Sequence, residues 1–207
     1  MQHWIPVSGL IILLSLGCFV GSDAEFSMSC DPAPQIEGSP APEATAGNPY
    51  TATFHGAYNC GMYSCFSLEP VSLPEGALID NYGVKTVRWT PPDSLAGTTQ
   101  TLTVRTPRDP CGDSAYFTWK VTVLPAPAIQ RFEAAAMALH PGESTSLTAV
   151  FTDGTGRIDL WTTGTLGEVL SGVPIATPPL LVTTTFELTV LNRLGHGTSR
   201  TLTVLVQ

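Results

Sequence analysis

Side chains that commonly carry catalysis or bind metals are few in this sequence, and their spacing matches no reactive motif. The four histidines, His3, His55, His140 and His196, have no cysteine, second histidine or carboxylate at a metal-ligand spacing such as His-Glu-x-x-His. The chain also lacks the Gly-x-Ser-x-Gly motif of a serine nucleophile and a glycine-rich loop that would hold phosphate. We therefore expect a protein that is not an enzyme and that needs no cofactor.

One short segment superficially resembles an aspartic-protease motif. Asp153-Gly154-Thr155-Gly156 contains the residue types of that motif in the wrong order. Because Asp-Gly is a strong signal for a tight turn between paired strands, the segment predicts a hairpin turn rather than a catalytic carboxylate.

Calcium binding would need several oxygen ligands that converge on one point. The aspartates Asp80, Asp93, Asp109 and Asp113 are scattered along the chain, which favours solvated surface carboxylates. Asp109 and Asp113, separated by Pro-Cys-Gly, are the best remaining candidates for calcium ligands. Calcium is therefore kept as an alternative to the absence of any metal.

The N-terminal segment predicts export. An apolar run that ends at Gly17 has the length of a signal-peptide core and is too short to span a bilayer. The junction Gly17-Cys18 resembles a bacterial lipobox, in which Cys18 would become the acylated first residue of the mature chain. Residues 1–17 are then a lipoprotein signal peptide and residues 18–29 a tether. The alternative is an ordinary signal peptide cleaved near Gly21 or Ala24, which would remove Cys18.

This anchor would hold the protein on a membrane through its N-terminal lipid. The residue after the cysteine is Phe19 and not the aspartate that favours retention in the inner membrane of some bacteria. We therefore expect a location in the cell envelope, at the outer membrane or the cell surface.

Four further cysteines remain after Cys18, and an even number in an exported chain predicts two disulfides with three alternative connectivities. They are Cys30, Cys60, Cys65 and Cys111. Two of them lie in a segment that also carries the aromatic residues Tyr58, Tyr63 and Phe66. This segment is either the stapled end of a domain or an aromatic loop that binds a ligand such as a sugar, and the first interpretation is favoured.

The overall charge excludes one class of partner. The 207 residues contain 9 Lys and Arg against 17 Asp and Glu, which gives a net charge of −8. No basic surface is therefore expected for a phosphate backbone, and nucleic-acid binding is excluded.

The elements that must position these side chains are short strands. Hydrophobic and polar residues alternate in several segments that are separated by Gly, Pro, Asn and Asp, which is typical of a β-sandwich. These segments include residues 50–54, 86–89, 101–105, 116–123, 146–151, 185–191 and 201–206. Pro125-Ala126-Pro127 interrupts the pattern, so we place a domain boundary there and predict one sandwich over residues 30–124 and a second over residues 125–207.

Two groups of segments carry a family resemblance. Residues 66–68, 73–80, 87–91, 102–105 and 117–123 resemble the cadherin-like immunoglobulin (Ig) modules of bacterial surface proteins. Residues 141–143 and 183–190, with Asn192, Gly195 and the strand 201–204, resemble another bacterial Ig-like repeat. Phe186 stands where such repeats often carry tyrosine, so that corner must be held by packing and not by a hydroxyl hydrogen bond.

The resemblance implies an all-β protein of two tandem Ig-like or cadherin-like sandwiches. It implies a non-enzymatic surface lipoprotein that acts as an adhesion, scaffold or spacer module toward an unknown protein or glycan partner. The alternative is a secreted carbohydrate-binding or enzyme-accessory module, and a cadherin-like calcium role is the third interpretation.

An Ig-like topology would also bring the four cysteines to one pole of the first domain. The favoured pairing is Cys60–Cys111 with Cys30–Cys65, and the alternative is Cys60–Cys65 with Cys30–Cys111. If Cys18 is anchored, this pole faces the membrane.

The second domain then points outward, with residues 140–143 and 172–179 farthest from the membrane. The apolar segment Gly172–Pro179 is either a partner-facing patch or a buried connector, and the buried connector is favoured. Residues 18–124 carry 11 acidic against 5 basic residues, and residues 125–207 carry 6 against 4. The nearly neutral outer domain is therefore the better place to seek a partner.

Overall fold

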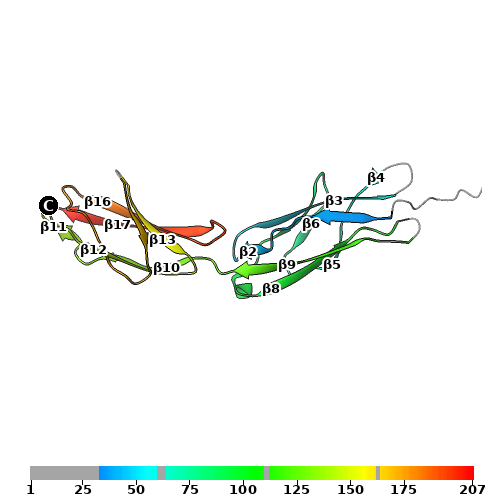
Figure 1. Ribbon diagram of the computed structural model, residues 1–207, viewed down its shortest axis with the longest axis horizontal. Helices are drawn as coiled ribbons and strands as arrows, with labels where there is room; N and C mark the ends of the chain where they lie inside the picture. Colours follow the sequence, from blue (N-terminus) through cyan, green and yellow to red (C-terminus); the bar gives the residue numbers. More distant parts are fainter. Residues whose placement is uncertain (1–32, 60–63, 110–111, 162–163) are drawn as a thin grey trace, which may run out of the picture.

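The protein is built of two β-sandwiches that follow one another along the chain and lie end to end (Figure 1). The computed structural model describes residues 33–59, 64–109, 112–161 and 164–207. Apart from one 3-10 turn at Asp93–Leu95, the regular elements of these residues are strands. None of the described segments forms a helix long and apolar enough to cross a membrane.

The first sandwich has the two sheets of an Ig domain. One sheet has the strand order β1-β3-β7-β6, with β4 paired to β3, and the other has the order β2-β9-β8-β5. This corresponds to the ABED and CFG sheets of the constant-type fold, with β2 added beside the last strand. The strands are β1 (Gln35–Gly38), β2 (Glu43–Thr45), β3 (Tyr50–Asn59), β4 (Ser64–Cys65), β5 (Glu69–Ser72), β6 (Leu78–Asp80), β7 (Lys85–Trp89), β8 (Thr99–Arg105) and β9 (Tyr116–Leu124).

The second sandwich repeats this plan with a different distribution of edge strands. Its sheets have the orders β10-β12-β15 and β11-β17-β16-β13-β14. In each sandwich a short early strand pairs in parallel with the last strand, β2 with β9 and β11 with β17. The strands are β10 (Ala128–Ala134), β11 (Ala138–Leu139), β12 (Ser146–Thr152), β13 (Thr155–Leu160), β14 (Gly164–Val169), β15 (Ile175–Ala176), β16 (Thr184–Leu191) and β17 (Gly197–Val206).

Alternation in the sequence explains which face of each strand is buried. In β9 the side chains of Trp119, Val121 and Val123 point into the sandwich, and the intervening residues point outward. In β16 the same period buries Phe186, Leu188 and Val190 completely. The all-β fold class and the tandem sandwiches predicted from the sequence are thereby confirmed.

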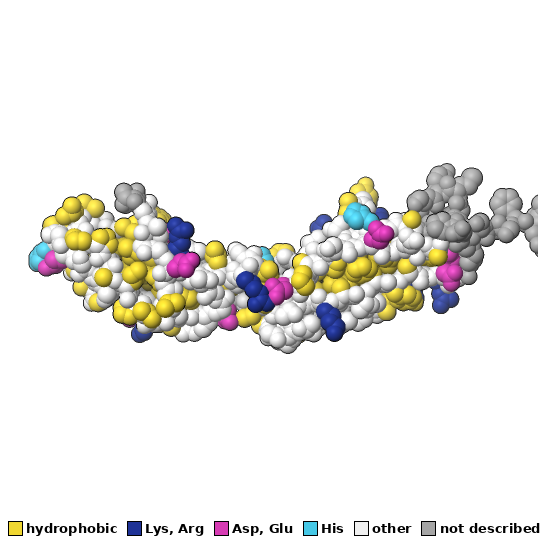
Figure 2. Space-filling view, in the orientation of Figure 1, with side chains coloured by type: hydrophobic (Ala, Val, Ile, Leu, Met, Phe, Trp, Pro, Cys, Tyr) yellow, Lys and Arg dark blue, Asp and Glu magenta, His cyan; other side chains and the backbone are white. Residues whose placement is uncertain are grey.

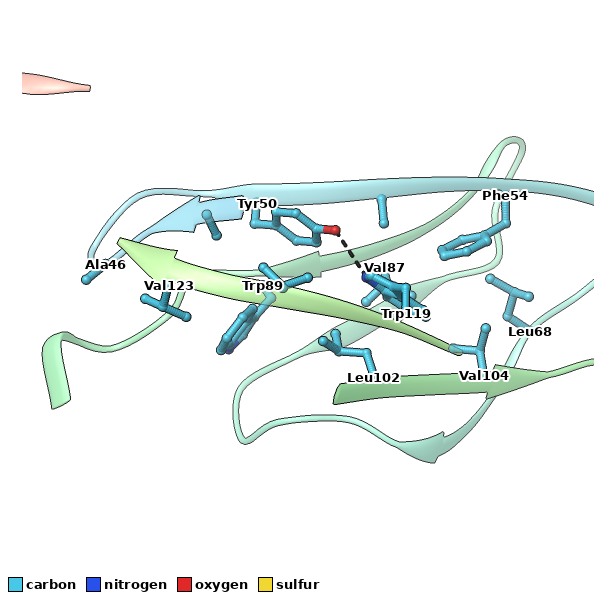
Figure 3. Packing of buried hydrophobic residues seen from close by; sticks show 13 residues of the cluster. Ala46, Tyr50, Phe54, Leu68, Val87, Trp89, Leu102, Val104, Trp119 and Val123 are labelled. Atoms are coloured by element: carbon cyan, nitrogen blue, oxygen red, sulfur yellow. Dashed lines mark hydrogen bonds between the residues drawn. The ribbon is translucent and has the colours of Figure 1, made fainter. Parts of the chain in front are cut away.

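The core of the first sandwich combines aliphatic side chains with the aromatic residues Tyr50, Phe54, Trp89 and Trp119 (Figure 3). The ring of Phe54 lies 5.3 Å from that of Phe117 and 5.1 Å from that of Trp119, measured between centroids. Trp119 donates its indole N–H to the hydroxyl of Tyr50 over 3.1 Å, and that hydroxyl donates to the carbonyl of Ala41 over 2.9 Å. Burial raises the pKa of the Tyr50 hydroxyl, and the hydrogen bond from Trp119 opposes this shift. The indole N–H of Trp119 and the hydroxyl of Tyr50 are therefore both satisfied.

The second core is separate from the first and is centred on Phe186. The ring has no solvent exposure, so the corner at the start of β16 is held by packing, as the missing tyrosine hydroxyl required. A neighbouring hydroxyl bonds the end of the chain to this corner, because Thr183 Oγ1 accepts the backbone N–H of Val206 over 3.1 Å.

The turn at Asp153-Gly154 is not the hairpin that the sequence predicted. It joins β12 to β13, which lie in different sheets and do not pair. Asp153 has a φ of 61°, the left-handed conformation that Asp tolerates better than most residues. A Cβ at Gly154 would lie 2.6 Å from the carbonyl oxygen of Leu191. The Asp-Gly signal therefore located the turn correctly but not the pairing of its strands.

Candidate functional site

Several of the predicted site residues lie outside the described residues. These are Cys18, Cys30, Cys60, Tyr63 and Cys111, so the lipid anchor and the disulfides stay predictions. The backbones of Tyr58 and Cys65 are described, and they pair across β3 and β4. Gln35 pairs with Ala57 in the antiparallel β1–β3 ladder, so the chain enters β1 at the same end at which β3 leaves the sheet.

Phe66 contributes to the wall of a groove at that end of the first sandwich. The groove has a volume of about 480 Å³ and is also lined by Phe54, His55, Gly56 and the segment Gly83–Lys85. Phe66 is half-buried and packs against the aromatic core. Its ring covers Gly56, where a Cβ would lie 2.6 Å from Phe66 Cε2 and 2.1 Å from the carbonyl oxygen of Gln35. Phe66 therefore packs on the first sandwich. Its membership of a ligand-binding loop stays a prediction.

A Gly56→Ala substitution is expected to destabilise the first sandwich by about 1–3 kcal/mol, because the added methyl overlaps the β1 backbone and the ring of Phe66. Chemical denaturation followed by tryptophan fluorescence measures the change. Gly164→Ala is the matched control, since no atom lies within 4 Å of the Cβ it would add. Equal stabilities of the two variants would show that Phe66 and β1 are not packed on Gly56.

The two aspartates considered for calcium shape a turn between β8 and β9. Asp109 is 5% exposed, and its carboxylate accepts the backbone N–H of Asp113 over 2.8 Å. The backbone N–H of Asp109 in turn donates to the carbonyl of Asp113 over 2.9 Å. One carboxylate thus closes the turn while Asp113 is exposed. Within the described ranges, no three His, Cys, Asp or Glu side chains are grouped so that they could hold a metal ion.

The three described histidines are far apart in the fold and do not form a cluster. His55 lies inside β3, which continues to Asn59. His140 lies at the far end of the second sandwich, where its backbone N–H donates to Glu143 and its Nδ1 is 3.2 Å from the carbonyl oxygen of Gln207. His196 lies in the turn between β16 and β17.

The apolar segment Gly172–Pro179 is largely on the surface, so the favoured prediction of a buried connector was wrong. Val173 is 51% exposed, and of these eight residues only Thr177 is fully buried. The hydroxyl of Thr177 accepts the backbone N–H of Thr145 and so holds the segment beside β12. β15 has only two residues, so only a short part of the segment pairs with β12 and the rest stays on the surface.

A polar contact that the sequence analysis did not identify joins the two sandwiches. We call Glu43, Thr45, Asn192 and Arg193 the interdomain clasp. The Arg193 guanidinium donates two hydrogen bonds to the Glu43 carboxylate, the one from Nε over 2.9 Å, and Asn192 donates to Thr45 Oγ1 over 2.8 Å. Figure 2 shows basic and acidic side chains side by side at this junction.

The clasp lies beside a short connector. β9 ends at Leu124 and β10 begins at Ala128, which leaves three residues between the sandwiches, two of them proline. The hydrogen bonds and charge of Arg193 lower the pKa of Glu43, and Glu43 raises that of Arg193. No sequence signal marks this pair, because its members are 150 residues apart.

Comparisons with known proteins show likeness in fold alone. No family model matches the chain, and no curated protein matches it. Solved structures of tandem Ig-like and fibronectin-like domains align with it. Extracellular domains 3–5 of Drosophila OTK are 13% identical, with 84% of this chain and 62% of that chain covered and a TM-score of 0.47.

Two further structures give similar values. The insect immune protein hemolin is 12% identical, with 87% of this chain and 48% of that chain covered and a TM-score of 0.44. The fibronectin(III)-like modules of CbhA from Clostridium thermocellum are also 12% identical, with coverages of 84% and 94% and a TM-score of 0.42. The chain spans about half the length of hemolin and less than two thirds of the OTK fragment.

Proposed function

We propose that this protein is a non-enzymatic, lipid-anchored protein of the bacterial cell envelope that acts as an adhesion, scaffold or spacer module. The observation that carries the proposal is the junction between the sandwiches. A three-residue connector and the hydrogen bonds of the interdomain clasp restrict how far the second sandwich can move relative to the first. A rigid pair of modules keeps an outer domain away from the surface to which its first domain is attached.

The placement of the chain ends supports this proposal. The first described residues and the C-terminus lie at opposite ends of the elongated molecule (Figure 1). A lipid on Cys18 would therefore attach the end that carries the first sandwich and leave the second sandwich outermost. The contrasting candidate is a secreted module without an anchor. In that case Cys18 would be removed with the signal peptide instead of being acylated.

Metabolic labelling with a fatty-acid analogue in a bacterial host is expected to mark the wild-type protein, and Cys18→Ser is expected to abolish the label. Cys30→Ser is the control that should keep the label, because it removes a cysteine outside the predicted lipidation site. Measurement is by gel fluorescence of the membrane fraction. Absence of label on the wild type would overturn the anchored function and favour the secreted module.

A further inference from the structure

The outer face of the larger sheet in the second sandwich carries an exposed tryptophan surrounded by polar side chains. We define the Trp161 face as Trp161, Asp159, Thr185, Glu187 and Thr201. Trp161 follows β13 directly and is 70% exposed. Its backbone N–H donates to the carbonyl of Thr185 over 3.1 Å, which places the residue beside the start of β16.

Strand register assembles the rest of this face. Asp159 of β13 pairs with Glu187 of β16, and Glu187 pairs with Thr201 of β17. These side chains alternate with the buried Ile158, Phe186 and Leu188, so they point away from the core. Side chains directly opposite on neighbouring strands lie about 5 Å apart at Cβ. A carboxylate pair and a hydroxyl therefore form one row across the sheet, next to the row that contains Trp161.

A pair of hydroxyls extends the polar surface beside Trp161. Thr185 and Thr203 are opposite one another, and their hydroxyl oxygens are 2.8 Å apart. β-Branched threonines have few χ1 rotamers, and the two hydroxyls bond to one another, so these hydroxyls are held in place before any ligand arrives. An aromatic ring beside fixed hydroxyls and carboxylates suits a ligand that has both an apolar face and many polar groups.

The charges of the face are unbalanced. Asp159 forms an ion pair with Arg157, whose Nε lies 2.9 Å from Asp159 Oδ1. The carboxylate of Glu187, which faces Asp159 directly, has no hydrogen-bond or ion-pair partner among the residues that the structure describes. Glu168 lies opposite Arg157 in the β13–β14 register, so this part of the sheet carries three carboxylates and one guanidinium, and the guanidinium pairs with Asp159. Like charges directly opposite one another destabilise a sheet, so Glu187 weakens the fold at this position.

The corresponding face of the first sandwich is different. Its exposed aromatic residue is Tyr116, which is 60% exposed, and the nearest carboxylate on that face, Glu69, is paired with Arg105 at 2.9 Å. Lys120 is also on that face, two outward-facing pairs along the β8–β9 ladder from Tyr116. Among the described residues, this face of the first sandwich therefore lacks the unpaired carboxylate that lies beside the exposed aromatic ring in the second.

We propose that the Trp161 face binds a polysaccharide whose sugars carry free amines. The apolar face of one sugar ring stacks on the indole of Trp161, the ammonium group of a neighbouring sugar pairs with Glu187 and Asp159, and the sugar hydroxyls bond to Thr185 and Thr201. Charge complementarity selects this occupant, because the carboxylates attract an ammonium and repel phosphate or carboxylate polymers. This proposal rests on the adhesion role proposed above and names the class of partner that the protein would bind in that role.

The experiment measures binding of the full mature protein to chitosan hexamer, a polymer of free amino sugars, by isothermal titration calorimetry. The acetylated hexamer of the same length is the comparison ligand. Trp161→Ala is expected to weaken chitosan binding about tenfold through loss of stacking. Glu187→Gln is expected to weaken it about threefold, as for a surface ion pair, and to raise the melting temperature because it removes the repulsion from Asp159.

Tyr116→Ala is the matched control, since it removes an exposed aromatic residue from the other sandwich, and it should leave binding unchanged. Chitosan binding that falls in both second-domain variants and weakens in high salt supports the proposal. No binding of the wild type to chitosan, equal binding of the acetylated hexamer, or an equal loss in Tyr116→Ala overturns it. Each of these results is independent of the fatty-acid label on Cys18, so failure of the glycan site is distinguishable from failure of the anchored function.

Discussion

Replacement of Phe54 by alanine is expected to unfold the first sandwich at a lower temperature while the second sandwich keeps its own transition. Phe54 is 1% exposed and packs against the rings of Phe117 and Trp119. Loss of a buried phenylalanine costs about 3–5 kcal/mol, because the removed contacts leave a cavity. A domain of this size has a total stability of about 5–15 kcal/mol, so a large share of it is removed.

Phe186→Ala is the reciprocal change in the second sandwich, where the ring has no solvent exposure. It is expected to lower the second transition by a similar amount and to leave the first in place, because the two cores share no buried residue. Differential scanning calorimetry resolves the two transitions. Trp89 and Trp119 are buried in the first core, so their fluorescence reports on that sandwich.

Leu78→Ala is the control for both variants, since Leu78 is 70% exposed and should contribute less than about 0.5 kcal/mol. A single transition that moves as one unit in Phe54→Ala and in Phe186→Ala would contradict the independence of the two cores.

Reversal of the charge at Arg193 is expected to free the second sandwich to move relative to the first. Arg193→Glu replaces the two hydrogen bonds to Glu43 by repulsion between carboxylates. Small-angle X-ray scattering should then show a broader distribution of interdomain distances and a reduced maximum dimension. The double variant Arg193→Glu with Glu43→Arg restores opposite charges and should recover most of the wild-type profile.

Arg88→Glu is the matched control, because Arg88 pairs with Asp80 within the first sandwich and 65% of its side chain is exposed. Its scattering profile should equal that of the wild type. Unchanged profiles for Arg193→Glu would show that the three-residue connector alone fixes the arrangement.

The clasp should also respond to pH in a defined direction. The pKa of Glu43 is lowered from its ordinary value of 4.5, chiefly by the hydrogen bond from Arg193. A lowered folded-state pKa means that the contribution of the pair is fully present above pH 4.5 and is lost as the pH falls through the lowered value. Arg193 stays charged throughout, so acidification of the wild type should reproduce the scattering change of Arg193→Glu.

The sequence predicts those features that depend on local period and composition. Alternation in residues 116–123 predicted the buried side chains of β9, and alternation in residues 185–191 predicted those of β16. These predictions succeed because a strand with one face in a core must place apolar residues at every second position. The connector at Pro125-Ala126-Pro127 was also predictable from local sequence, because two prolines in three residues interrupt a strand.

Features that depend on distant parts of the chain were not predictable. The Asp153-Gly154 turn has the residues of a hairpin, but its strands belong to different sheets, which only the tertiary fold decides. Gly172–Pro179 is apolar enough to be buried, yet the two-residue β15 leaves it on the surface. The interdomain clasp and the Trp161 face each combine residues from separate strands, so no spacing in the sequence indicates them.

The parallel pairing of β2 with β9, and of β11 with β17, has a mechanical consequence. In the first sandwich, Thr122 donates a backbone hydrogen bond to Pro42 and Ala46 donates one to Leu124, both over 2.9 Å. Tension along the chain would pull β2 and β9 in opposite directions parallel to their axes. The hydrogen bonds between them would then carry the force together in shear, instead of opening one after another from an end.

The second sandwich has the same arrangement at its far end. Leu205 donates to the carbonyl of Met137 over 2.8 Å, and Gln207 donates to that of Leu139 over 3.0 Å. If the proposed lipid anchor and the proposed glycan site are both engaged, the chain would experience this tension whenever cell and ligand move apart. Both sandwiches therefore present to a stretching force the geometry in which strands are hardest to separate.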